Sequence, residues 1–334
     1  MVRAMRRRVN LKTTGRILVT VLLLAVLVWV VDVREAGRIL LQANPVLLAL
    51  GIAVGLGDRV FMAMKWLPLL RAQSVAADAA AVVKAYLAAS FAGIFLPASV
   101  GADILRTIAL GRSGSVMAEV GASILVERLL GLIGSAILGV VALAVALNFS
   151  LDVSFILPWA AIAVSAPVAV VVLPQLPRVR ALLDRWTDAR DGSAGIAAFV
   201  RRFGAAYLAY RDHGRTLILV GILSILEQLV PIALLWLMAA ALGIGVTLPM
   251  LVVSVPLALF VNRLPIAFSS FGIMEGALVY LLGLFGVGSE EALALSLGGR
   301  VAELAAAVPG AFFWSVLVAD VPAPEAAEEE PTID

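Results

Sequence analysis

Residues 121–147 read GASILVERLLGLIGSAILGVVALAVAL, an apolar stretch whose only charged residues are the neighbours Glu127 and Arg128. A membrane-spanning helix needs about 20 mostly apolar residues, so this stretch is long enough to cross a bilayer. The whole composition agrees, because 62% of the residues are hydrophobic and only 14% are charged. Soluble domains contain about 25% charged residues. The sequence therefore predicts an all-α integral membrane protein.

Working outward from this stretch, we expect about six full transmembrane helices within a polytopic membrane domain at 16–319. Residues 1–15 form a basic N-terminus, which the positive-inside rule places in the cytoplasm. The basic stretch 174–215 is predicted to be a cytoplasmic loop on anionic lipid, and the acidic tail 320–334 to be disordered. The spans are expected at 16–33, 45–64, 121–147, 155–173, 216–242 and 298–319.

Two further apolar segments are broken in the middle. The first, Ala79–Leu96, runs into Pro97 and then Gly101, and cations lie on both sides of it at Lys65 and Arg112. A full crossing would separate those cations, whereas a re-entrant hairpin keeps both in the cytoplasm. Broken helices are tolerated at membrane depth where they line a cavity. We therefore predict a re-entrant helical hairpin.

The second broken segment repeats the first. Leu264 and Pro265 are followed by small polar residues, Gly272 and Glu275, as Leu-Pro, Gly101 and Asp103 follow one another earlier. The expected topology makes the two hairpins enter from opposite sides, as an inverted repeat at about 79–147 and about 248–319. Such repeats often bind substrate where their broken segments meet. The alternative is that Pro and Gly kink two ordinary spanning helices.

Charged residues inside the spans are functional candidates, because a charge at the bilayer centre costs roughly 2.5–3.5 kcal/mol on insertion scales. We expect both hairpin tips to meet at a midplane cavity that holds Glu127, Arg263, Arg300 and Glu303. No catalytic and no metal-ligating residues are proposed. The candidate substrate-binding residues are Pro97, Gly101, Asp103, Arg106, Glu127, Arg128, Glu227, Arg263, Pro265, Gly272, Glu275, Arg300 and Glu303.

Helical spacing suggests how some of these residues are paired. Arg300 and Glu303, three residues apart, can pair on one face. Asp103 and Arg106 have the same spacing. Each pair has a purely structural alternative, as an intrahelical or surface ion pair. Glu127 lies on a stripe of small and polar residues that should face other helices, while Arg128 reaches the interface. The stripe is Ser123, Glu127, Gly131, Ser135 and Gly139.

Several kinds of site are excluded. The chain contains no Cys and a single His, His213, so it cannot build a thiolate nucleophile or a multi-histidine metal site. It contains no Gly-x-x-x-x-Gly-Lys-[Ser/Thr] loop for a nucleotide. The basic loop lacks the interleaved aromatic residues that stack on nucleic-acid bases. No cofactor is expected.

With these residues in view, the chain resembles the transmembrane domain family named for lysylphosphatidylglycerol synthase, over about residues 15–319. The resemblance rests on Leu96–Asp103, on Glu127 with Arg128, and on Pro265–Glu275. Ala102 stands where the family usually has a second Gly, and Met274 precedes the acid. The resemblance implies a domain that flips aminoacylated phosphatidylglycerol in relatives that also carry a soluble synthase domain.

The chain up to Asp334 leaves no room for that synthase domain, so we expect a stand-alone flippase-like transporter of the cell inner (cytoplasmic) membrane and no enzyme. The implied partners are membrane lipids: anionic phospholipid, aminoacylated phosphatidylglycerol, a polyprenyl-linked lipid or a hopanoid. Two alternatives stay open: a membrane enzyme, or an accessory subunit in the synthesis of a lipid or a lipid-linked glycan. Homo-oligomerisation and a lipid-synthesis partner also stay open.

Overall fold

The computed structural model describes residues 33–94, 100–111, 116–148, 196–262 and 272–313, with a few single positions between 169 and 181. All regular secondary structure in this part of the chain is helical. The helices are α2 (Val33–Leu41), α3 (Pro45–Ala72), α4 (Ala79–Gly93), α5 (Val100–Leu110), α6 (Val116–Asn148), α9 (Ile196–Ala209), η3 (Tyr210–Asp212), α10 (Gly214–Glu227), α11 (Leu229–Leu242), α12 (Leu248–Asn262), α13 (Ile273–Gly283), α14 (Ser289–Ala307) and η4 (Val308–Phe313).

Four of the described helical segments are long and apolar enough to cross a membrane: Pro45–Ala72, Val116–Leu147, Gly214–Leu242 and Ser289–Phe313. They correspond to four of the predicted spans, and the chain is a multi-pass membrane protein. The predicted spans 16–33 and 155–173 lie outside the described residues, apart from single positions, as do the basic N-terminus and the acidic tail.

The first described span is longer than predicted. It begins at Pro45, where the Asn44 side chain caps the helix by accepting from the backbone N–H groups of Val46 and Leu47. We expected it to end near Lys65, but α3 continues to Ala72 and Lys65 is buried. Residues 66–70 are apolar and keep the helix in the interior.

The third span is interrupted at its middle. Pro231 has no N–H to donate to the carbonyl of Glu227, so the regular helix α10 ends at Glu227 and α11 begins at Leu229.

The residues just before this span pack against α3. Tyr210 of η3 is buried, and its hydroxyl donates to the Leu69 carbonyl of α3 at 2.8 Å. The end of the predicted basic loop is therefore helical and packs against α3.

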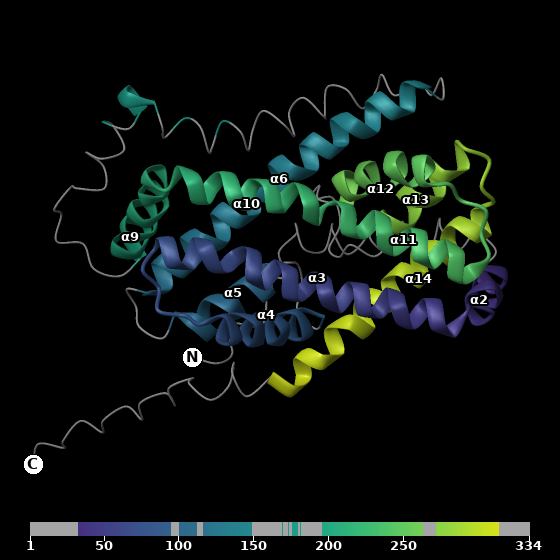
Figure 1. The fold of residues 1–334 in the computed structure, drawn as a ribbon, viewed down its shortest axis with the longest axis horizontal. Coiled ribbons are helices and arrows are strands. Elements are labelled where there is room, and N and C mark those ends of the chain that lie inside the picture. The colour runs from purple at the N-terminus through teal and green to yellow at the C-terminus, as the bar shows by residue number, and fades with distance from the viewer. Residues whose placement is uncertain are drawn as a thin grey trace, which may run out of the picture.

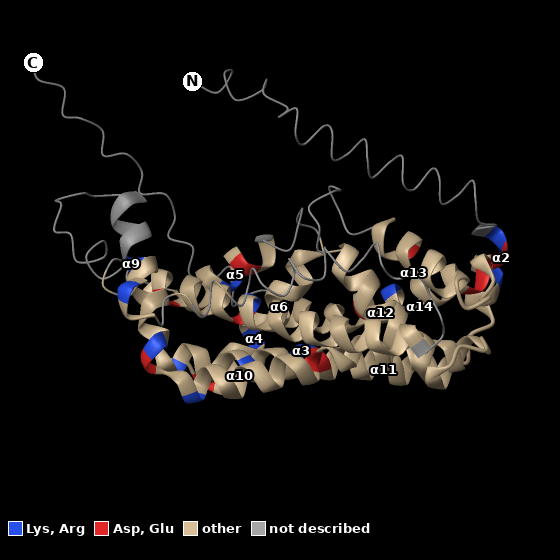
Figure 2. Ribbon diagram, turned by 90° about the horizontal axis from the view of Figure 1, so that it is seen from above, with Lys and Arg blue, Asp and Glu red and all other residues tan. Residues whose placement is uncertain are grey.

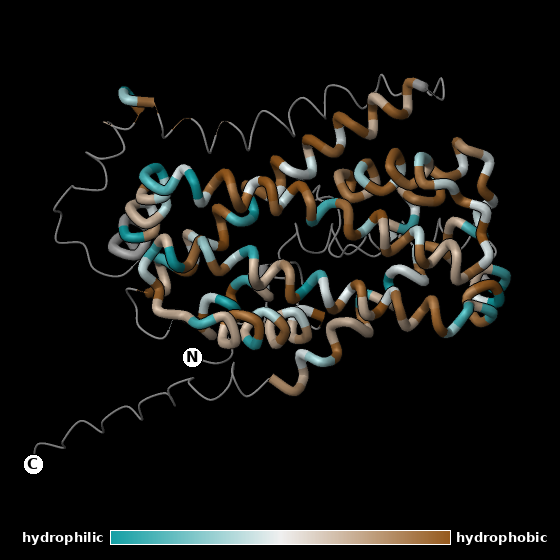
Figure 3. Tube along the Cα trace, in the orientation of Figure 1, coloured by the Kyte–Doolittle hydropathy of each residue, from teal (hydrophilic) through white to brown (hydrophobic). Residues whose placement is uncertain are grey.

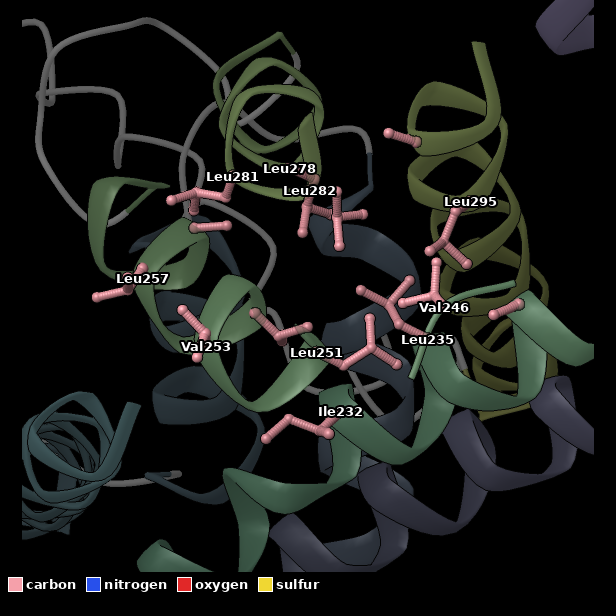
Figure 4. Packing of buried hydrophobic residues seen from close by; sticks show 14 of the residues in the cluster. Ile232, Leu235, Val246, Leu251, Val253, Leu257, Leu278, Leu281, Leu282 and Leu295 are labelled. Atoms are coloured by element: carbon pink, nitrogen blue, oxygen red, sulfur yellow. The ribbon is translucent and has the colours of Figure 1, made fainter. Parts of the chain in front are cut away.

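Figure 1 shows α3 and α10–α11 side by side along the long axis of the molecule, with α4 and α5 together at one end and α12 and α13 together at the other. The long helix α6 contacts both α10 and α12, while α14 contacts α3 and α13. The largest apolar cluster lies among α11, α12, α13 and α14, where Leu235, Leu251, Leu278 and Leu295 meet (Figure 4).

The two broken segments match each other in length. Helices α4 and α12 both have 15 residues, and α5 and α13 both have 11. Each pair is followed by a long helix, α6 or α14. Within the described residues, the two segments thus agree in the order of their helices and in the lengths of the two short ones.

Hydrophilic residues gather at α9 and at α2, at opposite ends of the long axis, with mainly hydrophobic helices between them (Figure 3). An apolar face of α10–α11 is open to the surroundings, as expected of a helix that faces lipid tails. Its exposed residues are Ile218, Leu219, Ile222, Leu226, Leu229 and Trp236.

Candidate functional site

The predicted hairpin tips cannot be placed, because Pro97, Arg263 and Pro265 lie outside the described residues. Gly101 is half-buried in the first turn of α5. The other candidates lie in the described helices, and Figure 2 shows charged positions within the helical body as well as at its ends. Most of the charged residues of the interior form two clusters, one beside α4–α5 and one beside α12–α13.

Arg106 on α5 is the centre of the first cluster. Its guanidinium donates to Asp103 at 2.6 Å and to Glu127 on α6 at 2.9 Å. The same group lies over the rings of Trp66 and Tyr86, at 4.8 and 4.7 Å from their centroids. Two carboxylates and two aromatic faces compensate a cation that has lost its water.

Asp103 joins α5 to α6. The predicted Asp103–Arg106 pair is confirmed, and the second oxygen of Asp103 accepts from Arg128. Arg128 is exposed, as expected, but it is also held by this ion pair. Asp103 and Arg106, the two charged residues of α5, thus both bind residues of α6.

Lys65 extends the cluster to α3 and α10. Its ammonium forms an ion pair with Glu227 and lies 4.0 Å from Oε1 of Glu127. The sequence analysis placed Lys65 at the cytoplasmic surface, and this was wrong because α3 carries it into the interior. The apolar residues that follow Lys65 were the signal that the helix continues.

The predicted polar stripe on α6 is confirmed for its serines. Ser123 accepts from the Trp66 indole at 2.8 Å, and Ser135 donates to Gln228 at 2.8 Å. The close approach of α6 to α10 uses a glycine beside this stripe. A Cβ at Gly134 would lie 2.8 Å from the Ser224 carbonyl oxygen on α10, whereas Gly131 has no atom within 4 Å of such a Cβ.

The second cluster lies beside the other hairpin. Glu275, in the first turn of α13, accepts from the backbone N–H of Gly272 at 2.6 Å and from Arg300 on α14 at 3.0 Å. Gly272 has a φ of +86°, which glycine adopts readily. Glu275 is therefore both a helix cap and an ion-pair partner. Arg300 thus forms an ion pair with Glu275 on another helix, and it is also a charged neighbour of Glu303, the partner predicted from the sequence.

Corresponding ion pairs hold the two hairpins. Asp103 and Arg128 are 25 residues apart, and so are Glu275 and Arg300. In each pair the acid lies in the first turn of an 11-residue helix, and the arginine lies in the long helix that follows. The two halves thus repeat in their charged contacts as well as in their helices.

Asp58 and Arg59, at the middle of α3, lie between the two clusters. Arg59 donates to the carbonyls of Gly55 at 2.8 Å and of Glu303 at 2.7 Å. Asp58 has Glu227 and Glu303 among its charged neighbours. The sequence analysis missed both residues, although a charged pair inside the predicted span 45–64 was a sufficient signal.

A cavity of about 60 Å³ opens beside the second cluster. Space of this size accommodates water or a small polar group. Arg300 and Glu303 line it, as predicted, but Glu127 does not and lies in the first cluster. Arg263, the fourth residue predicted for this cavity, lies outside the described residues. The polar lining is Asn262, Ser296, Arg300 and Glu303, and the apolar lining is Pro231, Leu234, Leu235, Leu259 and Met274, with Gly299 between them.

Among the described residues, no group of three or more His, Asp or Glu side chains could hold a metal ion. Most of the buried carboxylates are instead paired with Lys or Arg. A family model described as "Lysylphosphatidylglycerol synthase TM region" matches residues 15–310 of the chain. No curated protein and no solved structure gave a match.

Proposed function

The chain belongs to the family of the lysylphosphatidylglycerol synthase transmembrane region, and we propose that it moves the headgroup of an anionic lipid between the two leaflets of the inner membrane. The family connects the chain to lipid biology. The observation that carries the proposal is the series of charged side chains inside the described helices, from Asp103 and Arg128 through α3 to Glu275 and Arg300.

An anionic headgroup crosses by exchanging partners with these residues. The guanidinium of Arg300 lines the cavity and already binds a carboxylate, and phosphate accepts from the same N–H donors. A phosphate that replaces Glu275 on Arg300 therefore keeps a charged partner throughout the exchange. This limits the cost of an uncompensated charge in a medium of low dielectric constant. The acyl chains stay in the bilayer along apolar helix faces.

The proposed topology has six spans, a cytoplasmic N-terminus and two re-entrant hairpins, α4–α5 and α12–α13, that enter from opposite sides. Its support is the equal helix lengths, the positions of the hairpins at opposite ends of the long axis and the two corresponding ion pairs. We propose transport rather than catalysis, since most of the buried carboxylates of the described residues form ion pairs with Lys or Arg, which a charged headgroup can replace one after another.

Reconstitution into vesicles of phosphatidylcholine and phosphatidylglycerol tests this function. Fluorescent phosphatidylglycerol is followed by its accessibility to an impermeant quencher. Wild-type protein should speed exchange between leaflets, and Arg300→Gln should lower the rate by about tenfold or more, because it loses a charge-assisted contact. Arg38→Gln, which changes an exposed arginine of α2, is the control and should match wild type. Equal exchange in protein-free and wild-type vesicles would contradict the proposal.

Lipids that co-purify with the protein identify the headgroup class. Mass spectrometry should show one class enriched with wild type and lost from a Glu127→Gln/Arg300→Gln variant. Phosphatidylglycerol, its aminoacylated form, polyprenyl-linked lipid and hopanoid are distinguished by mass. Bulk lipid in unchanged proportion would remove these two residues from the binding site.

A further inference from the structure

Among the described residues, no Lys or Arg is bound to the carboxyl of Asp58, in contrast to Glu127, Glu227 and Glu275. Its Oδ1 atom is buried and has no hydrogen-bond partner. The adjacent Arg59 does not serve as partner, since neighbouring helix residues point in different directions and its guanidinium donates to two backbone carbonyls. Asp58 lies at the middle of a membrane span, where an unpaired charge is costly.

We propose that Asp58 is a proton-binding site that couples lipid movement to the movement of one proton across the membrane. The proposal rests on the function proposed above and adds its source of energy. In the described conformation the carboxyl takes up a proton, because a neutral acid with one unmet hydrogen bond costs about 1–3 kcal/mol, less than a buried unpaired charge. In a second conformation a cation reaches Asp58 and the proton leaves.

Lys65 is the cation placed to make that change. It is seven residues beyond Asp58 on α3, so it lies on the same helix face about 10 Å along the axis. Glu227, which binds Lys65, is also a charged neighbour of Asp58. The other charged neighbours of Asp58 among the described residues are Arg59 and, from α14, Glu303.

A second buried acid shows that Lys65 has more than one place to bind. Oε1 of Glu127 has no hydrogen-bond partner, although Glu127 is only 3% exposed, and it lies 4.0 Å from the Lys65 ammonium. The Lys65 ammonium thus lies near two glutamates, Glu127 and Glu227, and also donates to Met62 Sδ at 3.7 Å, while Asp58 lies farther along the same helix face. A proton on Asp58 leaves Lys65 with the two glutamates. Loss of that proton creates a third anion that competes for Lys65.

The proton is detected directly by infrared spectroscopy of the purified protein. Between about pH 6 and about pH 9 exposed carboxyls of ordinary pKa are ionised, so a protonated carboxyl band in this range reports a shielded acid. We expect such a band in wild type, its loss in Asp58→Asn and its retention in Glu291→Gln, which changes an exposed acid of α14. Asp58→Glu, which keeps a carboxyl, should restore it. A band unchanged in Asp58→Asn would overturn the proposal.

Coupling is measured in the same vesicles with an imposed pH difference. When one proton moves with each lipid, a difference of one pH unit across the membrane can shift the steady-state ratio of fluorescent phosphatidylglycerol between the two leaflets by up to about tenfold. We expect that shift in wild type and in Glu291→Gln, and none in Asp58→Asn. Rapid exchange whose steady state does not depend on the pH gradient would contradict proton coupling. Exchange that responds only to a Na⁺ gradient would also contradict it. Absence of any exchange would instead refute the lipid transport function, while the infrared band still decides whether Asp58 binds a proton.

Discussion

At the residue scale, Lys65 shows how a charge is kept inside a membrane helix. Its four-carbon chain and ammonium are almost completely buried, and carboxylates of α6 and α10 approach it from two sides. Removing one partner of a buried pair leaves the other charge uncompensated, at a cost of about 3–5 kcal/mol. The cluster is therefore expected to depend on Lys65 and Glu227 together rather than on either alone.

The change Lys65→Met tests this dependence. We expect it to lower the temperature of thermal unfolding in detergent, followed by circular dichroism, because Glu227 loses its cation. The double variant Lys65→Met/Glu227→Gln should recover part of the loss, since it removes both charges. Lys84→Met, which changes an exposed lysine of α4, is the matched control and should unfold like wild type. Equal stability of Lys65→Met and the control would show that the ion pair contributes nothing.

At the element scale, the sequence determines where helices lie better than it determines their contacts. Helix α12 begins at Leu248, where the second repeat was predicted to begin, and Glu275 lies in the first turn of α13, where an acid is favoured. The contact between Lys65 and Glu227 joins residues 162 positions apart, which no helical periodicity reveals.

Packing of the first hairpin depends on the absence of a side chain at Gly310. A Cβ there would lie 2.0 Å from the Leu87 carbonyl oxygen, so η4 can pack against α4 only with glycine at this position. We expect Gly310→Ala to lower the unfolding temperature and the lipid exchange rate. Gly139→Ala has no atom within 4 Å of the new Cβ and should be neutral or slightly stabilising, because alanine favours the helix by about 0.5–1 kcal/mol. An unaffected Gly310→Ala protein would mean that α4 and η4 separate without consequence.

At the scale of the whole molecule, the two broken segments α4–α5 and α12–α13 have a similar construction. Each has a 15-residue arm, an 11-residue arm and an acid bound to an arginine 25 residues later. Under the proposed function, a headgroup that breaks one of these ion pairs would meet the corresponding pair beside the other broken segment. Entrances on opposite sides, as in the proposed topology, would suit alternating access, in which a central site opens first to one leaflet and then to the other.

A re-entrant segment has both of its ends on the same side of the membrane. Single introduced cysteines test this, since the chain contains no cysteine of its own. Thr247 precedes α12 and Gly288 follows α13, and both are exposed. If α12–α13 enters and leaves on one side, Thr247→Cys and Gly288→Cys should both react with an impermeant maleimide from outside the cell. Ala76→Cys, in the exposed turn before α4, should react only from the cytoplasm. Labelling of the Thr247 and Gly288 variants from opposite sides would show that the broken segment spans the bilayer, and the two hairpins would no longer be related by inversion.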